Sequence, residues 1–292
     1  MDPRIESEDD GKDRTLKNTQ HILIRARRQI VGDRIGNNPS MFRGEGYDFI
    51  ELREYISGDD TRHIDWNVTA KLQRPYVKVF REERELSVVT VAMLGGALHF
   101  GTDRFKIESV AEAVALVGYS ALGNGDLFTH YNFSEALVDE VRGSKKRFAV
   151  AVSVEKVMSA ELIGHRADYN VMAATLYQRL RRKSLIVIIG DFFDIPALRL
   201  LAKKHEVVAV VVRDRFEEKP QILGFGSLSD PESGAVLEGD FNARSVQKYA
   251  QRVRAHDVEL FENFRSCGVR AVKLYTDANA SVVLRRLFEG RS

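Results

Sequence analysis

Two aspartates that directly follow a long apolar run are the residues of this chain best placed to do chemistry. The segment Leu185–Asp194 reads LIVIIGDFFD, and its apolar part has the composition of a strand buried on both faces of a sheet. Asp191 and Asp194 end that strand, where carboxylates can act as acids or bases or bind a hard cation such as Mg²⁺. With a third carboxylate from residues 59–65, they would suit metal-dependent hydrolysis of a phosphoester or ester. The competing structural interpretation is a helix cap before Pro196.

A second apolar run ends in a loop that offers no metal ligands. Residues 88–101 read VVTVAMLGGALHFG, in which Met93, Gly95 and Ala97 supply a thioether, a hydrogen and a methyl group. Mg²⁺ needs oxygen ligands, and one carboxylate such as Asp191 does not hold it alone. The seven histidines show no metal-ligand spacing, and neither a phosphate-binding glycine loop nor a nucleophile-elbow pattern occurs. The sequence therefore predicts no metal and no cofactor.

The elements that position these residues alternate between apolar strands and amphipathic helices from residue 86 onward. This alternation predicts an α/β fold with a doubly wound, mainly parallel sheet, whose ligand sites lie at the carboxyl ends of the strands. A turn-rich segment, residues 216–242, is typical of an inserted β-hairpin. The strands are predicted at 86–93, 127–133, 148–154, 185–190, 207–212 and 271–275, and the helices at 104–122, 168–182, 198–204, 243–266 and 278–288.

The chain before residue 86 differs in composition. Residues 1–14 are charged and predict a disordered tail, and residues 15–85 form a separate N-terminal region. Within that region, residues 16–31 predict an amphipathic helix with a basic face that includes Arg25, Arg27 and Arg28. A solvated polar face is the favoured interpretation, and contact with an anionic membrane surface or nucleic acid is the alternative. Residues 86–292 are predicted to form the main domain.

A dense cluster of charged and apolar residues lies between positions 53 and 66. A solvated charge run would not need the large apolar side chains interleaved with it. We expect the arginines to pair with the carboxylates, with Asp59 or Asp60 capping a helix that begins near Thr61. The favoured interpretation is a structural cluster that holds the N-terminal region to the sheet, and the alternative is a partner-binding surface. Its members are Arg53, Asp59, Asp60, Arg62, Asp65 and Trp66.

The segment Arg43–Glu85, RGEGYDFIELREYISGDDTRHIDWNVTAKLQRPYVKVFREERE, closely resembles the hallmark of domain-of-unknown-function family 58. That resemblance implies a von Willebrand A-like domain with an N-terminal extension. Many members have an Asp-x-Ser-x-Ser metal site where this chain has Met93, Gly95 and Ala97, so the resemblance implies a degenerate metal site in which Asp191 is the surviving carboxylate. It also implies a partner, a MoxR-type AAA+ ATPase.

Bulk composition is that of an ordinary globular protein. The chain has 292 residues, 44% apolar and 29% charged, and a net charge of +2 that by itself indicates no polyanionic partner. One cysteine, no signal-peptide pattern and no membrane span predict a soluble cytoplasmic protein. We therefore expect a non-enzymatic protein-interaction module, whose glycine-rich loops at the carboxyl ends of the strands and N-terminal charged cluster dock a partner. The alternative is a metal-dependent hydrolase using Asp191 and Asp194.

Overall fold

The computed structural model describes residues 15–30, 49–59, 61–80, 86–222 and 224–289. The chain forms two compact units, a larger one of Met1–Phe42 with Ser87–Ser292 and a smaller one of Arg43–Leu86. The predicted tail, residues 1–14, lies outside the described residues.

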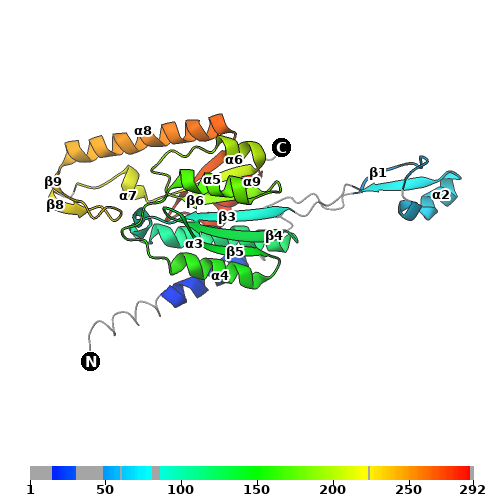
Figure 1. The fold of residues 1–292 in the computed structure, drawn as a ribbon, viewed down its shortest axis with the longest axis horizontal. Coiled ribbons are helices and arrows are strands. Elements are labelled where there is room, and N and C mark those ends of the chain that lie inside the picture. Colours follow the sequence, from blue (N-terminus) through cyan, green and yellow to red (C-terminus); the bar gives the residue numbers. More distant parts are fainter. Residues whose placement is uncertain (1–14, 31–48, 60, 81–85, 223, 290–292) are drawn as a thin grey trace, which may run out of the picture. The chain divides into compact units, whose positions relative to one another are not determined.

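A six-stranded sheet forms the centre of the larger unit (Figure 1). Its strand order is β10-β7-β6-β3-β4-β5, and every neighbouring pair is parallel except β4 with β5. This confirms the predicted α/β class with a mainly parallel sheet. The strands are β3 (Ser87–Met93), β4 (Leu127–Phe133), β5 (Leu137–Ser144), β6 (Leu185–Gly190), β7 (Glu206–Arg213) and β10 (Arg270–Tyr275).

Helices cover both faces of this sheet, because successive strand residues point to opposite sides. Val89 and Val91 pack with Met172 of α5 and Phe264 of α8 in one buried cluster. The other face contacts α3 and α4, which lie below the sheet in Figure 1. The helices are α3 (Lys106–Gly123), α4 (Arg147–Met158), α5 (Tyr169–Arg179), α6 (Arg199–Lys204), α8 (Ala243–Cys267) and α9 (Ala280–Glu289).

The strand predicted at 148–154 is wrong, because these residues belong to α4. Its buried residues recur at helical spacing, as in Ala149, Val150, Val154 and Val157. The strand at this edge of the sheet is instead β5, whose polar sequence LVDEVRGS carries no apolar run.

The predicted N-terminal region, 15–85, does not form one unit. The helix over residues 15–30 belongs to the larger unit, where Ile22 and Ala26 are buried. Its Asn18 donates to Glu108 of α3 at 3.0 Å, and its Arg25 lies 3.3 Å from Glu112. The smaller unit contains the antiparallel strands β1 (Phe49–Glu54) and β2 (Tyr76–Phe80), with η1 (Thr61–His63) and α2 (Trp66–Leu72) between them.

The β-hairpin predicted within residues 216–242 is present. It follows the short helix α7 (Arg215–Glu218) and contains β8 (Gly224–Ser229) and β9 (Val236–Phe241), joined by a turn at residues 230–235. That turn contacts the loop after β3, as described below.

Candidate functional site

The carboxyl ends of β3 and β6 form the topological switch point of the sheet, since the chain continues from β3 to β4 on one side and reaches β6 on the other. Asp191, which follows β6, is buried there. Its Oδ1 accepts a hydrogen bond from Tyr169 Oη at 3.1 Å. Burial, followed by the negative charge of Asp191, raises the pKa of Tyr169 well above its usual value. Asp191 is therefore part of a buried hydrogen-bonded pair.

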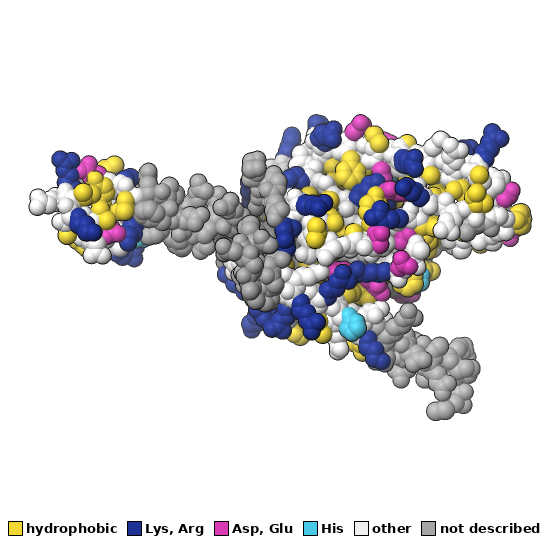
Figure 2. All heavy atoms as spheres, turned by 180° about the vertical axis from the view of Figure 1, so that it is seen from behind, with side chains coloured by type: hydrophobic (Ala, Val, Ile, Leu, Met, Phe, Trp, Pro, Cys, Tyr) yellow, Lys and Arg dark blue, Asp and Glu magenta, His cyan; other side chains and the backbone are white. Residues whose placement is uncertain are grey.

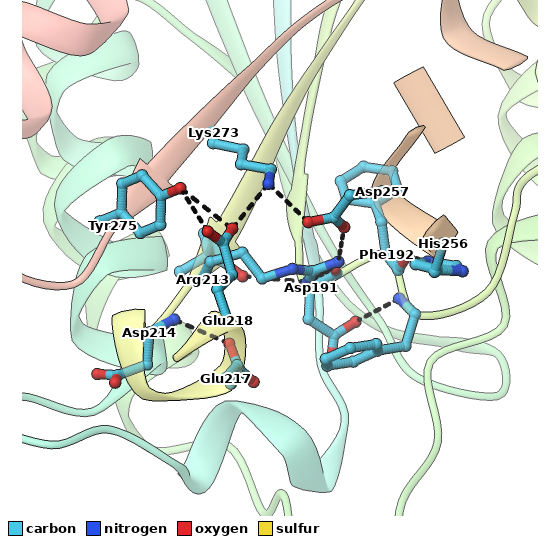
Figure 3. A network of polar contacts seen from close by, with 12 residues as sticks. Asp191, Phe192, Arg213, Asp214, Glu217, Glu218, His256, Asp257, Lys273 and Tyr275 are labelled. Atoms are coloured by element: carbon cyan, nitrogen blue, oxygen red, sulfur yellow. Dashed lines mark hydrogen bonds and ion pairs between the residues drawn. The ribbon is translucent and has the colours of Figure 1, made fainter. Parts of the chain in front are cut away.

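Phe192 is held in a left-handed backbone conformation, with φ of 53°. Its N–H donates to Tyr169 Oη at 2.7 Å, and its carbonyl accepts from His256 Nε2 at 2.9 Å (Figure 3). Its ring stacks on Tyr169 at 4.6 Å and meets Phe264 edge-on at 5.3 Å. A non-glycine residue in this region costs on the order of 1–3 kcal/mol, which these contacts offset.

The tip of the β8–β9 hairpin fills the crevice beside the switch point. The carbonyl of Pro231 accepts a hydrogen bond from Gly164 N at 2.8 Å. A Cβ atom on Gly96 would lie 2.4 Å from that carbonyl oxygen, and one on Gly95 would lie 3.0 Å from Glu232 Oε1. The backbone of the chain's own turn therefore requires glycine at position 96, whereas Gly95 is approached by the end of the Glu232 side chain and by Ala167 N at 3.2 Å.

Gly95 is the predicted degenerate metal-site position at this contact, and the other predicted positions have structural surroundings as well. Met93 is buried in the core cluster with Tyr169. The backbone N–H of Ala97 hydrogen-bonds Glu232. We expected the glycine-rich loop to receive a partner, but in this structure the loop is covered by the hairpin tip.

Glu232 brings a carboxylate to the place where the sequence showed none. Burial, then the charges of Asp191 and Asp230, raise the pKa of Glu232. Arg166 Nε lies 4.0 Å from Glu232, and Arg166 Nη2 donates to Asp194 Oδ1 at 2.8 Å.

Asp191 and Asp194, the predicted pair, therefore bond different partners. Asp194 is exposed and bound to Arg166, whereas Asp191 is buried against Tyr169. Among the described residues, no group of three or more His, Cys, Asp or Glu side chains is placed to hold a metal ion.

A buried network of charged side chains, which the sequence did not predict, contacts the backbone of Asp191 at the switch point (Figure 3). Arg213, at the end of β7, is fully buried and donates to the carbonyl of Asp191. Its Nη2 also donates to Asp257 Oδ1 of α8 at 2.9 Å, and Lys273 of β10 lies 2.6 Å from Asp257 and 2.7 Å from Glu218. Burial opposes ionisation of Asp257, but Arg213 and Lys273 lower its pKa. An arginine that ends the apolar strand EVVAVVVR was the only sequence signal.

A shallow cavity of about 230 Å³ lies beside the ends of β7 and β10. Asp214 lines it, but its carboxylate already accepts hydrogen bonds from Thr102 Oγ1 and Thr276 Oγ1, each at 2.7 Å. It also accepts from Phe216 N at 2.9 Å as the N-cap of α7. Asp214 therefore fixes the loops that surround the cavity.

The smaller unit contains the predicted charged cluster. Arg53 forms two hydrogen bonds with Asp59, at 2.7 and 2.8 Å, and thereby lowers the pKa of Asp59. Asp65 is the N-cap of α2 and lies 2.9 Å from Lys78, whereas Asp59 accepts hydrogen bonds from Arg53 and from the backbone N–H of Ile56. Asp60 lies outside the described residues.

The two remaining members of the cluster are exposed. Arg62 lies in η1, and 70% of the Trp66 surface is accessible. The Arg53–Asp59 pair is internal to the smaller unit. The observed pairs thus stabilise this unit and leave Trp66 at its surface.

These features define an α/β protein with a mainly parallel six-stranded sheet and a separate small unit. The chain belongs to the family described as "Protein of unknown function DUF58", whose model matches residues 51–259. It is 29% identical over 263 residues to Uncharacterized protein Mb1516 of Mycobacterium bovis and to Uncharacterized protein Rv1480 of Mycobacterium tuberculosis. Each alignment covers 88% of this chain and 83% of the relative.

Solved structures also resemble this chain. An aerotolerance-related membrane protein from Bacteroides fragilis aligns with a TM-score of 0.44 and 11% identity, and BatB from Bacteroides thetaiotaomicron with 0.41 and 8%. Each covers 70% of this chain and 98% of its own. In the part of the chain that the structure describes, no helix is long and apolar enough to cross a bilayer.

Proposed function

We propose that this chain is a non-enzymatic protein-interaction module, in which the larger unit is a von Willebrand A-like domain with a degenerate metal site. The observation that carries the proposal is the hairpin tip seated on Gly95 and Gly96. It covers the switch point, where open α/β sheets bind their ligands. Because the chain's own backbone covers the switch point, we infer that this site has a structural role and that a partner binds to a different surface.

The smaller unit offers that surface. Trp66, Ile56 and Leu72 are 70%, 64% and 54% exposed, although they are large apolar side chains in a unit of only about forty residues. Tryptophan is among the residues that contribute most to protein–protein affinity when a partner buries them. The partner that we propose is a MoxR-type AAA+ ATPase, on the strength of the family resemblance.

The test is affinity purification of the tagged protein from its native cells in the presence of ATP, with mass spectrometry of the recovered proteins. We expect an AAA+ ATPase to be enriched with the unmodified chain and at least tenfold depleted with Trp66→Ala. Arg53→Ala is a poor probe, because the loss of two hydrogen bonds to Asp59 would disturb the unit itself.

The matched control is Leu200→Ala, which removes an apolar side chain of similar exposure, 64%, from α6 of the larger unit. Equal recovery of the ATPase with Trp66→Ala and Leu200→Ala would reject this surface. The absence of any AAA+ ATPase would reject the partner. The alternative, a metal-dependent hydrolase that uses Asp191 and Asp194, gains no specific support, since the two carboxylates bond different partners.

A further inference from the structure

Two turns at one end of the larger unit carry a group of exposed cations among the described residues, and we call this surface the basic rim. It combines the turn between β5 and α4 with the turn between α5 and β6. The segments 142–148 and 179–184 read RGSKKRF and RLRRKS and contain no acidic residue. The exposed cations of the rim are Arg142, Lys145, Lys146, Arg147, Arg181, Arg182 and Lys183.

The fold brings these two turns to the same end of the sheet. β6 begins just after the second turn, and β5, which is antiparallel, ends at the first. Arg179 at the end of α5 donates to Glu140 of β5 at 2.8 Å, and Arg142 is two residues further along β5. In Figure 2, lysine and arginine side chains gather at the lower left of the larger unit, with few acidic side chains among them.

The helix over residues 15–30 adds a further cation to this region. Burial raises the pKa of Tyr119, and the positive charges of Arg27 and Arg147 act against that rise. The charges of these two arginines thus act on the same hydroxyl, although they come from segments far apart in the chain.

Folding does not account for the cations at the start of α4. Lys146 is the N-cap of this helix and Arg147 its first residue, while the first turn contains no acidic residue and no side-chain cap. The N-terminus of a helix carries a partial positive charge, so cations there are unfavourable. The cations after α5 lie at a favourable helix C-terminus, whereas Lys146 and Arg147 lie at an unfavourable N-terminus.

An exposed aromatic residue, Phe148, follows these cations directly. It is 75% exposed, directly beside Lys145, Lys146 and Arg147. Proteins that bind to membrane surfaces combine cations for lipid head groups with an exposed aromatic residue for the acyl boundary. Nucleic acid is less well matched, since single-strand binding uses several aromatic rings in succession and these two turns expose one.

We propose that the basic rim docks the larger unit on an anionic phospholipid bilayer, with the cations at the head groups and Phe148 inserted among them. The turns suit a flat partner, because they are tips at one end of a single sheet. Binding is then peripheral and depends on ionic strength.

The test is flotation of the full chain with phosphatidylcholine vesicles that contain about one third phosphatidylserine, across a series of salt concentrations. Each cation near an anionic surface contributes about a fivefold gain in partitioning. We expect the triple substitution Lys145→Gln, Lys146→Gln and Arg147→Gln to lower partitioning about a hundredfold at low salt. Phe148→Ala should lower it several-fold and leave the salt dependence unchanged.

The matched control neutralises three exposed cations of α8, Arg244, Lys248 and Arg252, which changes the net charge equally. This control should bind like the unmodified chain. A double variant, Lys146→Gln with Arg147→Gln, should also melt no lower than the unmodified chain, because it removes unfavourable charges from a helix N-terminus.

Three results would overturn the proposal. The first is no flotation of the unmodified chain at low salt. The second is equal loss of binding in the rim and α8 variants, which would indicate net charge alone. The third is tighter binding to DNA than to vesicles at the same salt concentration, which would assign the rim to nucleic acid.

Discussion

Gly96 is the position at which the contact between the hairpin tip and the switch point can be tested most directly. A Cβ atom added there would lie 2.4 Å from the carbonyl oxygen of Pro231 and 2.5 Å from its carbon, whereas ordinary contacts are 3.4 Å or longer. Both clashing atoms are backbone, so Gly96→Ala must displace the tip by about 1 Å or strain the loop.

The magnitude follows from what the displacement breaks. The hydrogen bond from Gly164 N to the Pro231 carbonyl is worth about 1 kcal/mol, and overpacking a close contact costs about 1–3 kcal/mol. We expect Gly96→Ala to lower the free energy of unfolding by about 2 kcal/mol, or the melting temperature by roughly 4–8 °C. Gly239→Ala is the matched control, because a Cβ atom on this hairpin glycine meets nothing within 4 Å.

The assay is urea unfolding followed by circular dichroism, in two backgrounds. The second background deletes Pro231–Ser233 and Ala235, so that the hairpin closes on Asp230 and Gly234 as a two-residue turn. Without the tip, Gly96→Ala should cost less than about 0.5 kcal/mol. An equal cost in both backgrounds would show that the tip is not what requires glycine at this position, and the reasoning would fail.

Two further predictions concern buried groups of the same unit. His130 lies between Thr90 Oγ1 at 2.9 Å and Asn132 Oδ1 at 2.8 Å, and burial lowers its pKa from 6.5 to about 4. Because the pKa of His130 is lower in the folded chain than in the unfolded chain, protonation of this residue favours unfolding. The free energy of unfolding should therefore be unaffected by His130 above pH 6.5 and fall by about 3 kcal/mol as the pH drops to 4. In urea unfolding across that range, the difference in stability between the unmodified chain and His130→Leu should shrink by the same amount. Asp191→Ala removes the acceptor of the Tyr169 hydroxyl and should cost about 1–2 kcal/mol equally with Mg²⁺ and with a chelator, as measured by thermal melting. A loss of stability that appears only with Mg²⁺ would argue for an intact metal site.

The sheet was predictable from the sequence where burial is complete. Leu185–Gly190 is buried throughout, so its composition alone indicates a central strand. Edge elements were not predictable in this way. β5 has charged residues because one side of it is solvated, and α4 was mistaken for a strand because FAVAVSV is rich in β-branched residues. Residues 148–154 form a helix because they pack against α3, and this tertiary contact cannot be read from the local sequence.

The candidate site was predictable only in its location. Strand order places Asp191 at the switch point, and the apolar run before it gave that position. Gly96 contacts Pro231, which is more than a hundred positions further along the chain, and the local sequence around either residue does not predict this contact. The same holds for Arg213 and Asp257, whose pairing depends on where α8 crosses the sheet.

Phe192, Arg147 and Trp66 each depart from what their local structure prefers, and their surroundings separate two kinds of departure. Phe192 has a positive φ, but Tyr169, His256 and Phe264 all contact it, so the fold itself compensates the strain. Arg147 at a helix N-terminus and the exposed Trp66 have no such compensation among the contacts described above. Natural sequences tolerate uncompensated departures mainly at functional sites. Phe192 therefore belongs to the packed core of the larger unit, and the two surface residues lie on the surfaces that we propose as binding sites.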